Sequence, residues 1–239
     1  MTFDALRPLA ARAALFSALR QDQFVMAVDA LGEHRWDADL NAGTITFTSV
    51  ADPSRRIAAT AHLIASVAPE ARSVLWGWAH PMGAPDGIAV KLRDYGSQYG
   101  LPALAEGETP FPEGIADVDA WVIDAAHVVG GVAGELTGRA PYFAADAGAG
   151  TRVVFVLDGV LGPLTVADAV IALPRILAST ELPDPRTSVW DLARLAAWNL
   201  QWTDDAFTGA TVTDATGSAT FRFDERARIA GIESSLVAA

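Results

Sequence analysis

Two indole rings and an imidazole recur at alternate positions in Ser73–Pro81, which reads Ser-Val-Leu-Trp-Gly-Trp-Ala-His-Pro. As a β-strand, this segment would direct Trp76, Trp78 and His80 to one face, because successive side chains of a strand alternate. Aromatic side chains of this size bury a large area. The shared face is therefore either the heart of a hydrophobic core or the floor of a groove for a flat or apolar ligand.

A groove at this face would have further aromatic walls. The candidate ligand-binding residues are Trp36, Trp76, Trp78, His80, Tyr95 and Tyr99. The alternative is a core, in which both indoles pack under the amino-terminal helix and His80 caps the strand end with a hydrogen bond. We favour this core interpretation. Between the rings, Gly77 lacks a side chain and would let another backbone approach the opposite face of the strand.

The four histidines are far apart in the sequence. They are His34, His62, His80 and His127, and no pair has the spacing of HxH or HExxH. A metal site would have to be assembled by the fold alone, so we expect no metal. His127 lies beside the apolar stripe of an expected helix, and we interpret it as a core histidine.

Short motifs of nucleophilic and cofactor-dependent enzymes are missing from the sequence. It contains no GxSxG, SxxK or P-loop, and its clustered glycines do not form GxGxxG after a strand. Asp37 and Asp39 share one face of an expected strand, where two carboxylates could perform acid–base chemistry, but a solvated strand face is the favoured interpretation. We therefore expect no cofactor, leave catalytic residues unassigned and lean away from an enzyme.

Composition narrows the class of protein. The 239 residues are 51% apolar and 19% charged, which is typical of a globular protein with a large core. The net charge of −12 disfavours nucleic acid and anionic lipid as partners, and cysteine is absent. No apolar run reaches the roughly 18–20 residues that span a bilayer, and the amino terminus does not resemble a signal peptide. We expect a cytoplasmic protein.

Apolar periodicity predicts a helix over residues 3–30 and then four strands, near 34–40, 43–50, 55–66 and 72–80. Short turns between the strands predict an antiparallel meander, one face of which the first helix should cover. A helix over about 87–99 follows, with Asp86 as its N-cap and Gly100 at the C′ position.

The loop Leu101–Phe111 is rich in Pro, Gly and Glu. It is the candidate linker between residues 1–100 and 112–239, which could also form one compact unit. Apolar residues repeating every seven positions predict a helix over 112–137 that starts at Pro112. Gly130 and Gly131 would weaken this helix, so we interpret them as sites of close packing against a sheet or another helix.

The rest of the chain alternates between strand and helix patterns. Short strands are expected near 142–144 and 152–157, helices over 165–179, with Thr165 as its cap, and 187–201, and strands near 208–213, 217–224 and 227–234. The fold class is therefore α+β, with antiparallel β-meanders packed by amphipathic helices. Gly217–Phe221 echoes Gly43–Phe47, so two weakly related helix-plus-meander halves are an alternative to chance similarity.

Four motifs resemble an uncharacterised bacterial family that is classed as a domain of unknown function. They are W-x-x-D-L-x-x-G-T-I-T-F (Trp36 to Phe47), L-W-G-W-A-H-P (Leu75 to Pro81), L-R-x-Y-G (Leu92 to Gly96) and F-D-x-x-x-R-I-x-x-I (Phe223 to Ile232). The resemblance covers most of the chain, and the tryptophan motif is its most specific part. Where the family tends to have Asn after W-G-W-A, this chain has His80. The resemblance implies no activity, cofactor or catalytic residue.

Three functional hypotheses follow. The first is a noncatalytic small-molecule-binding or protein-interaction protein that uses the aromatic face around Trp76 and Trp78. The second is an enzyme with a fold-assembled site, in which His80 acts as acid or base beside Asp94 or Tyr95. The third is an acidic immunity-type partner of a basic protein, which the net charge permits.

Overall fold

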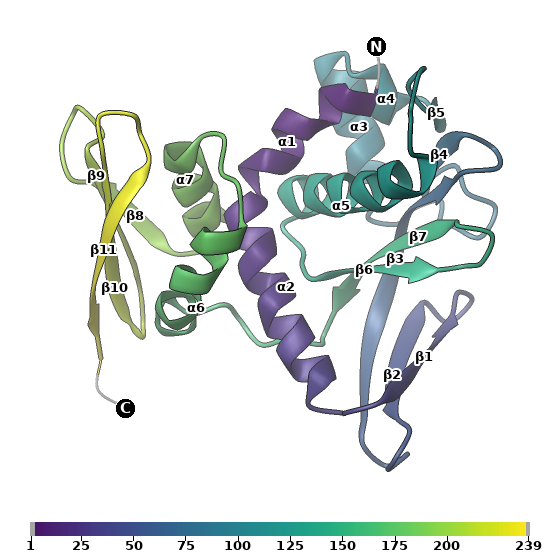
Figure 1. Cartoon of the computed structure of the whole chain (residues 1–239), viewed down its shortest axis with the longest axis horizontal. Coiled ribbons are helices and arrows are strands. Elements are labelled where there is room, and N and C mark those ends of the chain that lie inside the picture. The colour runs from purple at the N-terminus through teal and green to yellow at the C-terminus, as the bar shows by residue number, and fades with distance from the viewer. Residues whose placement is uncertain (1–2, 238–239) are drawn as a thin grey trace. The chain divides into compact units, whose positions relative to one another are not determined.

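The computed structural model describes residues 3–237, which fold into helices and two antiparallel sheets (Figure 1). The predicted α+β class with antiparallel sheets is confirmed. The chain divides into two compact units. Unit 1 holds the described residues up to Ala10 together with Phe24–Leu161, and unit 2 holds Ala11–Gln23 together with the described residues from Gly162 onward.

The sheet of unit 1 has seven strands. They are β1 (His34–Asp39), β2 (Thr44–Ser49), β3 (Arg56–Ala68), β4 (Ser73–Trp76), β5 (Glu108–Pro110), β6 (Tyr142–Asp146) and β7 (Arg152–Asp158). The strands β1 to β5 follow one another across the sheet, while β7 pairs with β3 and β6 pairs with β7. Strand β3 is therefore the centre of unit 1, because it pairs with three other strands.

One edge of β3 is interrupted. Strand β7 pairs along Thr60–Val67, whereas the opposite edge is divided between β2, along Arg56–Thr60, and β4, along Ala65–Ala68. Residues 61–64 of β3 therefore face the space between β2 and β4. The chain that follows β4 enters this space, where the N–H of Gly77 donates to the carbonyl of Ile64.

Unit 1 buries apolar side chains on both faces of the sheet. Its helical elements are η1 (Phe3–Leu6), most of α1 (Arg7–Arg12), the end of α2 (Ala14–Asp29), α3 (Val90–Tyr99), α4 (Pro102–Ala105) and α5 (Val118–Thr137). Helix α5 packs on β3 and β7 (Figure 1), and its cluster, which we call the Trp76 core, includes Phe3, Val129 and Val156. The other cluster, the Phe47 core, joins Phe24 of α2 to Phe155 of β7.

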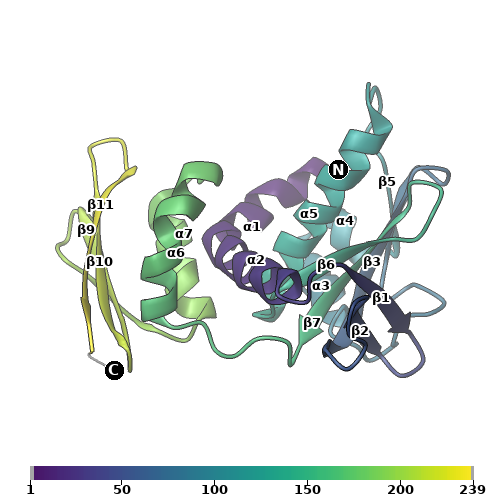
Figure 2. The same cartoon turned by 60° about the horizontal axis from the view of Figure 1, so that its bottom comes forward.

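Unit 2 is built from helices and a separate four-stranded sheet. Its elements are the first part of α2, α6 (Val166–Ser179), α7 (Pro185–Leu195), β8 (Asn199–Trp202), β9 (Gly209–Asp214), β10 (Gly217–Phe223) and β11 (Ile229–Leu236). The strand order is β11-β10-β9-β8. Figure 2 shows this sheet on edge, with α6 and α7 on one side of it.

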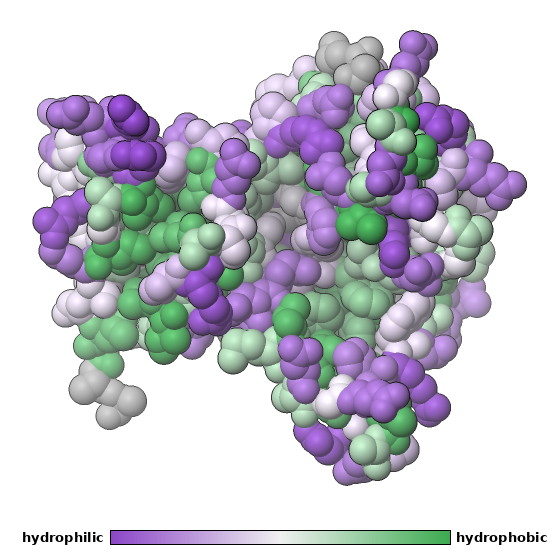
Figure 3. Space-filling model, viewed as in Figure 1, coloured by the Kyte–Doolittle hydropathy of each residue, from purple (hydrophilic) through white to green (hydrophobic). Residues whose placement is uncertain are grey.

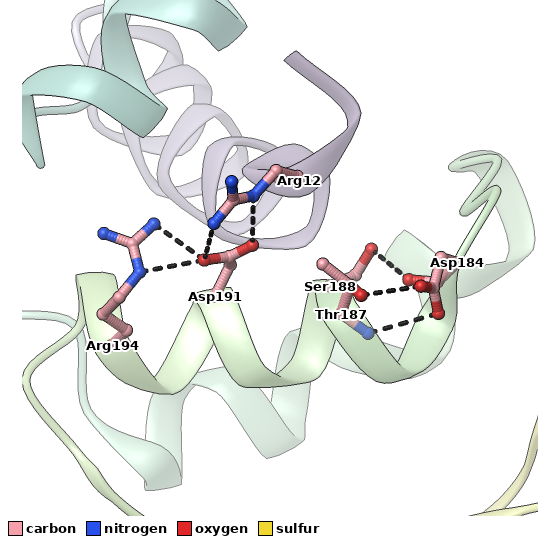
Figure 4. Close-up of polar contacts among 6 residues, drawn as sticks. All are labelled: Arg12, Asp184, Thr187, Ser188, Asp191 and Arg194. Atoms are coloured by element: carbon pink, nitrogen blue, oxygen red, sulfur yellow. Dashed lines mark hydrogen bonds and ion pairs between the residues drawn. The ribbon is translucent and has the colours of Figure 1, made fainter. Parts of the chain in front are cut away.

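A buried carboxylate organises the helices of unit 2. The side chain of Asp191, on α7, is fully buried, and its oxygens accept hydrogen bonds from the guanidinium groups of Arg12 and Arg194 (Figure 4). At the start of the same helix, the Asp184 carboxylate accepts from the backbone N–H and the hydroxyl of Thr187, which caps the helix. The first contact joins chain segments almost 180 residues apart.

Most predicted elements are found within two or three residues of their expected ends. The caps Gly100, with φ of 64°, and Thr165, whose hydroxyl accepts from Asp168 N–H, are confirmed. The close packing predicted at two helix glycines is also confirmed, because a Cβ on Gly130 would stand 2.5 Å from the Tyr142 ring and one on Gly131 would stand 3.0 Å from Ala10.

Other boundaries were wrong. Helix α5 begins at Val118, capped by Asp117 instead of starting at Pro112, and α3 has Ala89 instead of Asp86 at its N-cap. Helix α7 ends at Leu195, and strand β8 occupies residues that the helical pattern had included. The expected linker, 101–111, lies within unit 1, where it forms α4 and β5.

Candidate functional site

The tryptophan segment divides into a strand and a turn. Strand β4 ends at Trp76, so the expectation of a continuous strand to His80 was wrong. The Trp76 side chain is fully buried, and its Nε1–H donates to Thr109 Oγ1 at 3.1 Å. The Thr109 hydroxyl in turn donates to the carbonyl of Ala103. Because its indole is enclosed and its N–H has a partner, Trp76 belongs to the core.

Gly77 carries the chain across the interruption in the sheet. Its N–H donates to the carbonyl of Ile64 at 2.6 Å. A Cβ on this residue would stand 2.1 Å from the carbonyl oxygen of Leu63, and a Cβ on Gly83 would stand 1.7 Å from the carbonyl oxygen of Gly77. The close backbone approach predicted at Gly77 is therefore confirmed. Three backbone segments stack here, and two of them require glycine.

The residues after Gly77 form a run of turns instead of one strand face. Trp78 is half-buried against the Trp76 core, and the guanidinium of Arg93 lies 5.7 Å from the centre of its ring. Its buried Nε1–H has no hydrogen-bond partner among residues 3–237. His80 accepts a hydrogen bond at Nδ1 from the N–H of Met82 at 3.0 Å, and burial lowers the pKa of this imidazole. The imidazole therefore caps a turn.

The remaining candidate aromatic residues are distributed over two places. Tyr95 packs on the Trp76 core, and its ring centre lies 4.4 Å from that of Tyr99, which is exposed. Trp36 is 39% exposed, and its ring meets that of Phe143, which packs against the Phe47 core, edge to face at 5.5 Å. The fold therefore brings Trp76, Trp78 and Tyr95 together and places Trp36 elsewhere.

A pocket lies beside the stacked glycines. Its volume is about 170 Å³, and three chain segments line it, which are the β1–β2 turn (Leu40, Ala42, Gly43), the interrupted part of β3 (Thr60–Leu63) and the loop before α3 (Met82, Ala84, Gly87–Ala89). The N–H of Ala61 donates to the Gly43 carbonyl, which fixes the turn to β3. The loop is fixed by its own backbone bonds, from Gly83 to His80 and from Gly87 to Ala84.

His62 is the ionisable side chain of this pocket. Its Nε2 lies 3.0 Å from Oδ2 of Asp158, on β7, and that same oxygen forms an ion pair with Arg139, which directly follows the C-cap of α5. Burial lowers the pKa of His62, and the positive charge of Arg139 lowers it further. The imidazole is therefore neutral near pH 7, with Nε2–H directed to the carboxylate and Nδ1 left as an acceptor.

Sequence reasoning did not single out His62. Its partners lie 77 and 96 positions away in the chain, so no local spacing reports their meeting. The antiparallel pairing of β3 with β7, which places Thr60 opposite Asp158, creates the contact. Within residues 3–237, no group of three histidine or acidic residues is placed to hold a metal ion, and no helix there is long and apolar enough to cross a bilayer.

Comparison with known proteins gives one match. A model of a family of unknown function, DUF6882, matches residues 7–160. No curated protein and no solved structure matches the chain. The matched region contains the pocket and all six candidate aromatic and histidine residues, whereas the closing segment Phe223–Ile232 lies outside it.

Proposed function

The chain belongs to the DUF6882 family, a family of unknown function, and from this premise we propose that unit 1 is a noncatalytic binding domain for a small, neutral, polar molecule. The observation that carries the proposal is the pocket at the interruption of β3, with the neutral imidazole of His62 in its wall. The family match spans every residue that lines this pocket.

The size of the pocket limits the ligand. Pockets for drug-sized ligands commonly have volumes of about 300–1,000 Å³. The present pocket, of about 170 Å³, is smaller and suits a molecule of fewer than about ten non-hydrogen atoms. The His62 side chain keeps 25% of its exposure, so a ligand can reach it.

The charge of the lining favours a neutral ligand. Asp158 and Arg139 form an ion pair with each other, and the lowered pKa of His62 keeps its imidazole uncharged near pH 7. The side chains that can form hydrogen bonds with a ligand are those of His62 and Thr60, and the other lining side chains are apolar or absent. A neutral molecule that both donates and accepts hydrogen bonds matches such a lining, because a buried charge would lack a counter-charge.

In this proposal the tryptophan segment builds the pocket instead of lining it. Trp76 anchors β4 in the core, Gly77 brings the chain against β3, and His80 holds the N–H of Met82, a lining residue. The aromatic residues of the predicted face therefore act on binding through the position of the loop. Their replacement should change affinity and stability together.

Met82 provides a direct test of ligand binding. The chain has three methionines, so the methyl resonance of Met82 can be assigned with one Met82→Leu variant in a protein labelled at the methionine methyl carbon. We expect acetamide or glycerol to shift this resonance in a saturable manner, and acetate and inorganic phosphate to shift it at least tenfold more weakly. His62→Ala should weaken binding of the neutral probe at least tenfold.

A matched control is His34→Asn, because His34 lies outside the pocket and bonds to the Gly32 carbonyl. This variant should bind the neutral probe as the unchanged protein does. A Met82 resonance that none of the four probes shifts would refute the proposed pocket. Stronger binding of acetate or phosphate than of acetamide or glycerol would refute a neutral ligand.

A second candidate function is general base catalysis by His62. The hydrogen bond from Nε2 to Asp158 leaves Nδ1 able to accept a proton, as a general base requires. In this alternative the catalytic imidazole is His62 and not His80, whose Nδ1 is occupied by the N–H of Met82. Hydrolysis of 4-nitrophenyl acetate that is lost in His62→Asn and kept in His80→Asn would favour the enzyme over the binding protein.

A further inference from the structure

Unit 2 contains a pocket that is larger and more aromatic than the His62 pocket of unit 1. Its volume is about 340 Å³, within the usual range of small-molecule sites. Helix α7 contributes Arg186 and Trp190, strand β8 contributes Trp202, and the two loops that follow β8 and β10 contribute Phe207 and Ala227. All of these residues lie outside the region that matches the family. In Figure 3, apolar residues gather on the surface over α6, α7 and β8.

The pocket presents flat ring surfaces to the solvent. Trp190 is 41% exposed and Phe207 is 46% exposed, although both are large aromatic residues. Phe207 meets Trp202 edge to face, with ring centres 5.0 Å apart and planes at 89°. Exposed aromatic residues that gather around one concavity are typical of binding sites, and flat ligands stack on such rings.

Two loops hold the pocket in shape without a ligand. Phe207 and Ala227 both have positive φ, of 56° and 59°, which is unfavourable for residues other than glycine. In each loop an aspartate three positions earlier supports this conformation. The carboxylate of Asp204 accepts from the N–H groups of Ala206 and Thr208, and that of Asp224 accepts from those of Arg226 and Arg228. The same loop construction therefore occurs twice at this end of the sheet.

Arg186 supplies a positive charge to the lining of this pocket. Its guanidinium lies 5.8 Å from the centre of the Phe223 ring, and its buried Nε has no hydrogen-bond partner among residues 3–237. The neighbouring carboxylate of Asp184 accepts hydrogen bonds from Thr187, and its charge attracts that of Arg186. An unpartnered buried donor costs about 1–3 kcal/mol, and an acceptor on a ligand would remove that cost.

We propose that this pocket binds a planar aromatic carboxylate, with the ring against Trp190, Trp202 and Phe207 and the carboxylate on Arg186. A guanidinium pairs with a carboxylate through two parallel hydrogen bonds, which gives this group its specificity. A singly charged group suits the site because one arginine faces it and Asp184 lies nearby, so a doubly charged phosphate would meet repulsion.

Calorimetric titration of the full chain with two matched probes tests this site. The probes are 2-naphthoate and 2-naphthylmethanol, which share a ring system and differ in charge. We expect 2-naphthoate to bind at least tenfold more tightly than 2-naphthylmethanol. The Arg186→Gln variant should still bind the alcohol but should lose this difference between the two probes. Equal binding of the two probes to the unchanged protein would refute the carboxylate, and binding of neither would refute the pocket.

Phe207→Gly and Ala227→Gly form a matched pair of variants. Each places glycine at a positive φ, so neither should impair folding. Phe207→Gly removes an aromatic wall and should weaken both probes at least fivefold, whereas Ala227→Gly removes one methyl group and should leave both affinities within twofold. Equal effects of the two variants would contradict ring stacking, and tighter binding of 2-naphthyl phosphate than of 2-naphthoate would contradict the preference for a carboxylate.

Discussion

The carbonyl oxygen of Leu63 lies so close to Gly77 that a Cβ on this glycine would stand 2.1 Å from it. Real Cβ atoms essentially never approach a backbone oxygen so closely, and neither backbone is the end of a flexible side chain. The glycine between the two tryptophans is thus the residue at which the tryptophan segment closes the interrupted edge of β3. Its small size, more than its flexibility, is what the fold requires.

Gly77→Ala should destabilise the protein by about 3 kcal/mol, because overpacking against a backbone cannot be relieved by a rotamer change. Urea denaturation measures this difference in the free energy of unfolding. Gly231→Ala is the matched control, since a Cβ at Gly231 meets no atom within 4 Å and the residue lacks a positive φ. A loss of less than about 1 kcal/mol in the free energy of unfolding of Gly77→Ala would contradict the close approach of the Leu63 carbonyl to Gly77.

Stability should fall as the pH drops below about 6.5. The pKa of His62 is lowered by burial and by Arg139, so the unfolded chain binds a proton at a pH where the folded chain does not. His80, whose pKa burial also lowers, adds to the effect. The stability that the neutral imidazoles contribute is fully present at a pH above the ordinary histidine pKa of 6.5. It is lost as the pH falls toward the lowered pKa of the folded state. Urea denaturation of His62→Asn from about pH 7.5 to 5 should show a shallower decline, and an unchanged slope would contradict this assignment.

Asp191→Ala should lower the free energy of unfolding by about 3–5 kcal/mol, because it removes the carboxylate that the guanidinium groups of Arg12 and Arg194 share. Asp124→Ala is the matched control, since Asp124 pairs with Arg7 while both side chains remain about half exposed. An exposed pair of this kind contributes less than about 1 kcal/mol. Similar losses for the two variants, measured by thermal unfolding, would contradict a special role for the buried carboxylate.

One of the three tyrosines should ionise late. Burial raises the pKa of Tyr142 to about 12. Ultraviolet titration of tyrosinate should therefore show one group that titrates near pH 12, and this group should be missing in Tyr142→Phe. Because the unfolded phenol ionises near its ordinary pKa of 10, stability should decline between about pH 10 and 12. Ionisation of three tyrosines in one step near pH 10 would refute this prediction.

Local patterns predicted the elements well, because apolar periodicity and capping residues act over a few positions. The alternation of Ile45 and Phe47 and the position of Gly100 led to the correct strand and helix end. The strand at Trp76 was extended too far, since the alternation continues through Trp78 and His80 while the backbone turns at Gly77 to reach β3. This turn depends on a gap between strands that are distant in sequence.

The pocket-lining imidazole could not be predicted for a related reason. His62 gains its role from Asp158 and Arg139, and their meeting depends on the register of β3 with β7 and on the end of α5. Nothing near His62 in the sequence distinguishes it from the other three histidines. The aromatic pocket of unit 2 was missed similarly, because Trp190 and Phe207 lie in segments that the patterns described as a helix and a connection.

Helix α2 has a consequence for any truncation of the gene, because its residues up to Gln23 belong to unit 2 and those from Phe24 belong to unit 1. A gene truncated after residue 161 would encode all of unit 1 together with a stranded piece of unit 2. A cut at that point therefore does not release unit 2 as one intact piece. A substitution along this one helix affects unit 2 where it lies before Phe24 and unit 1 where it lies at Phe24 or after it.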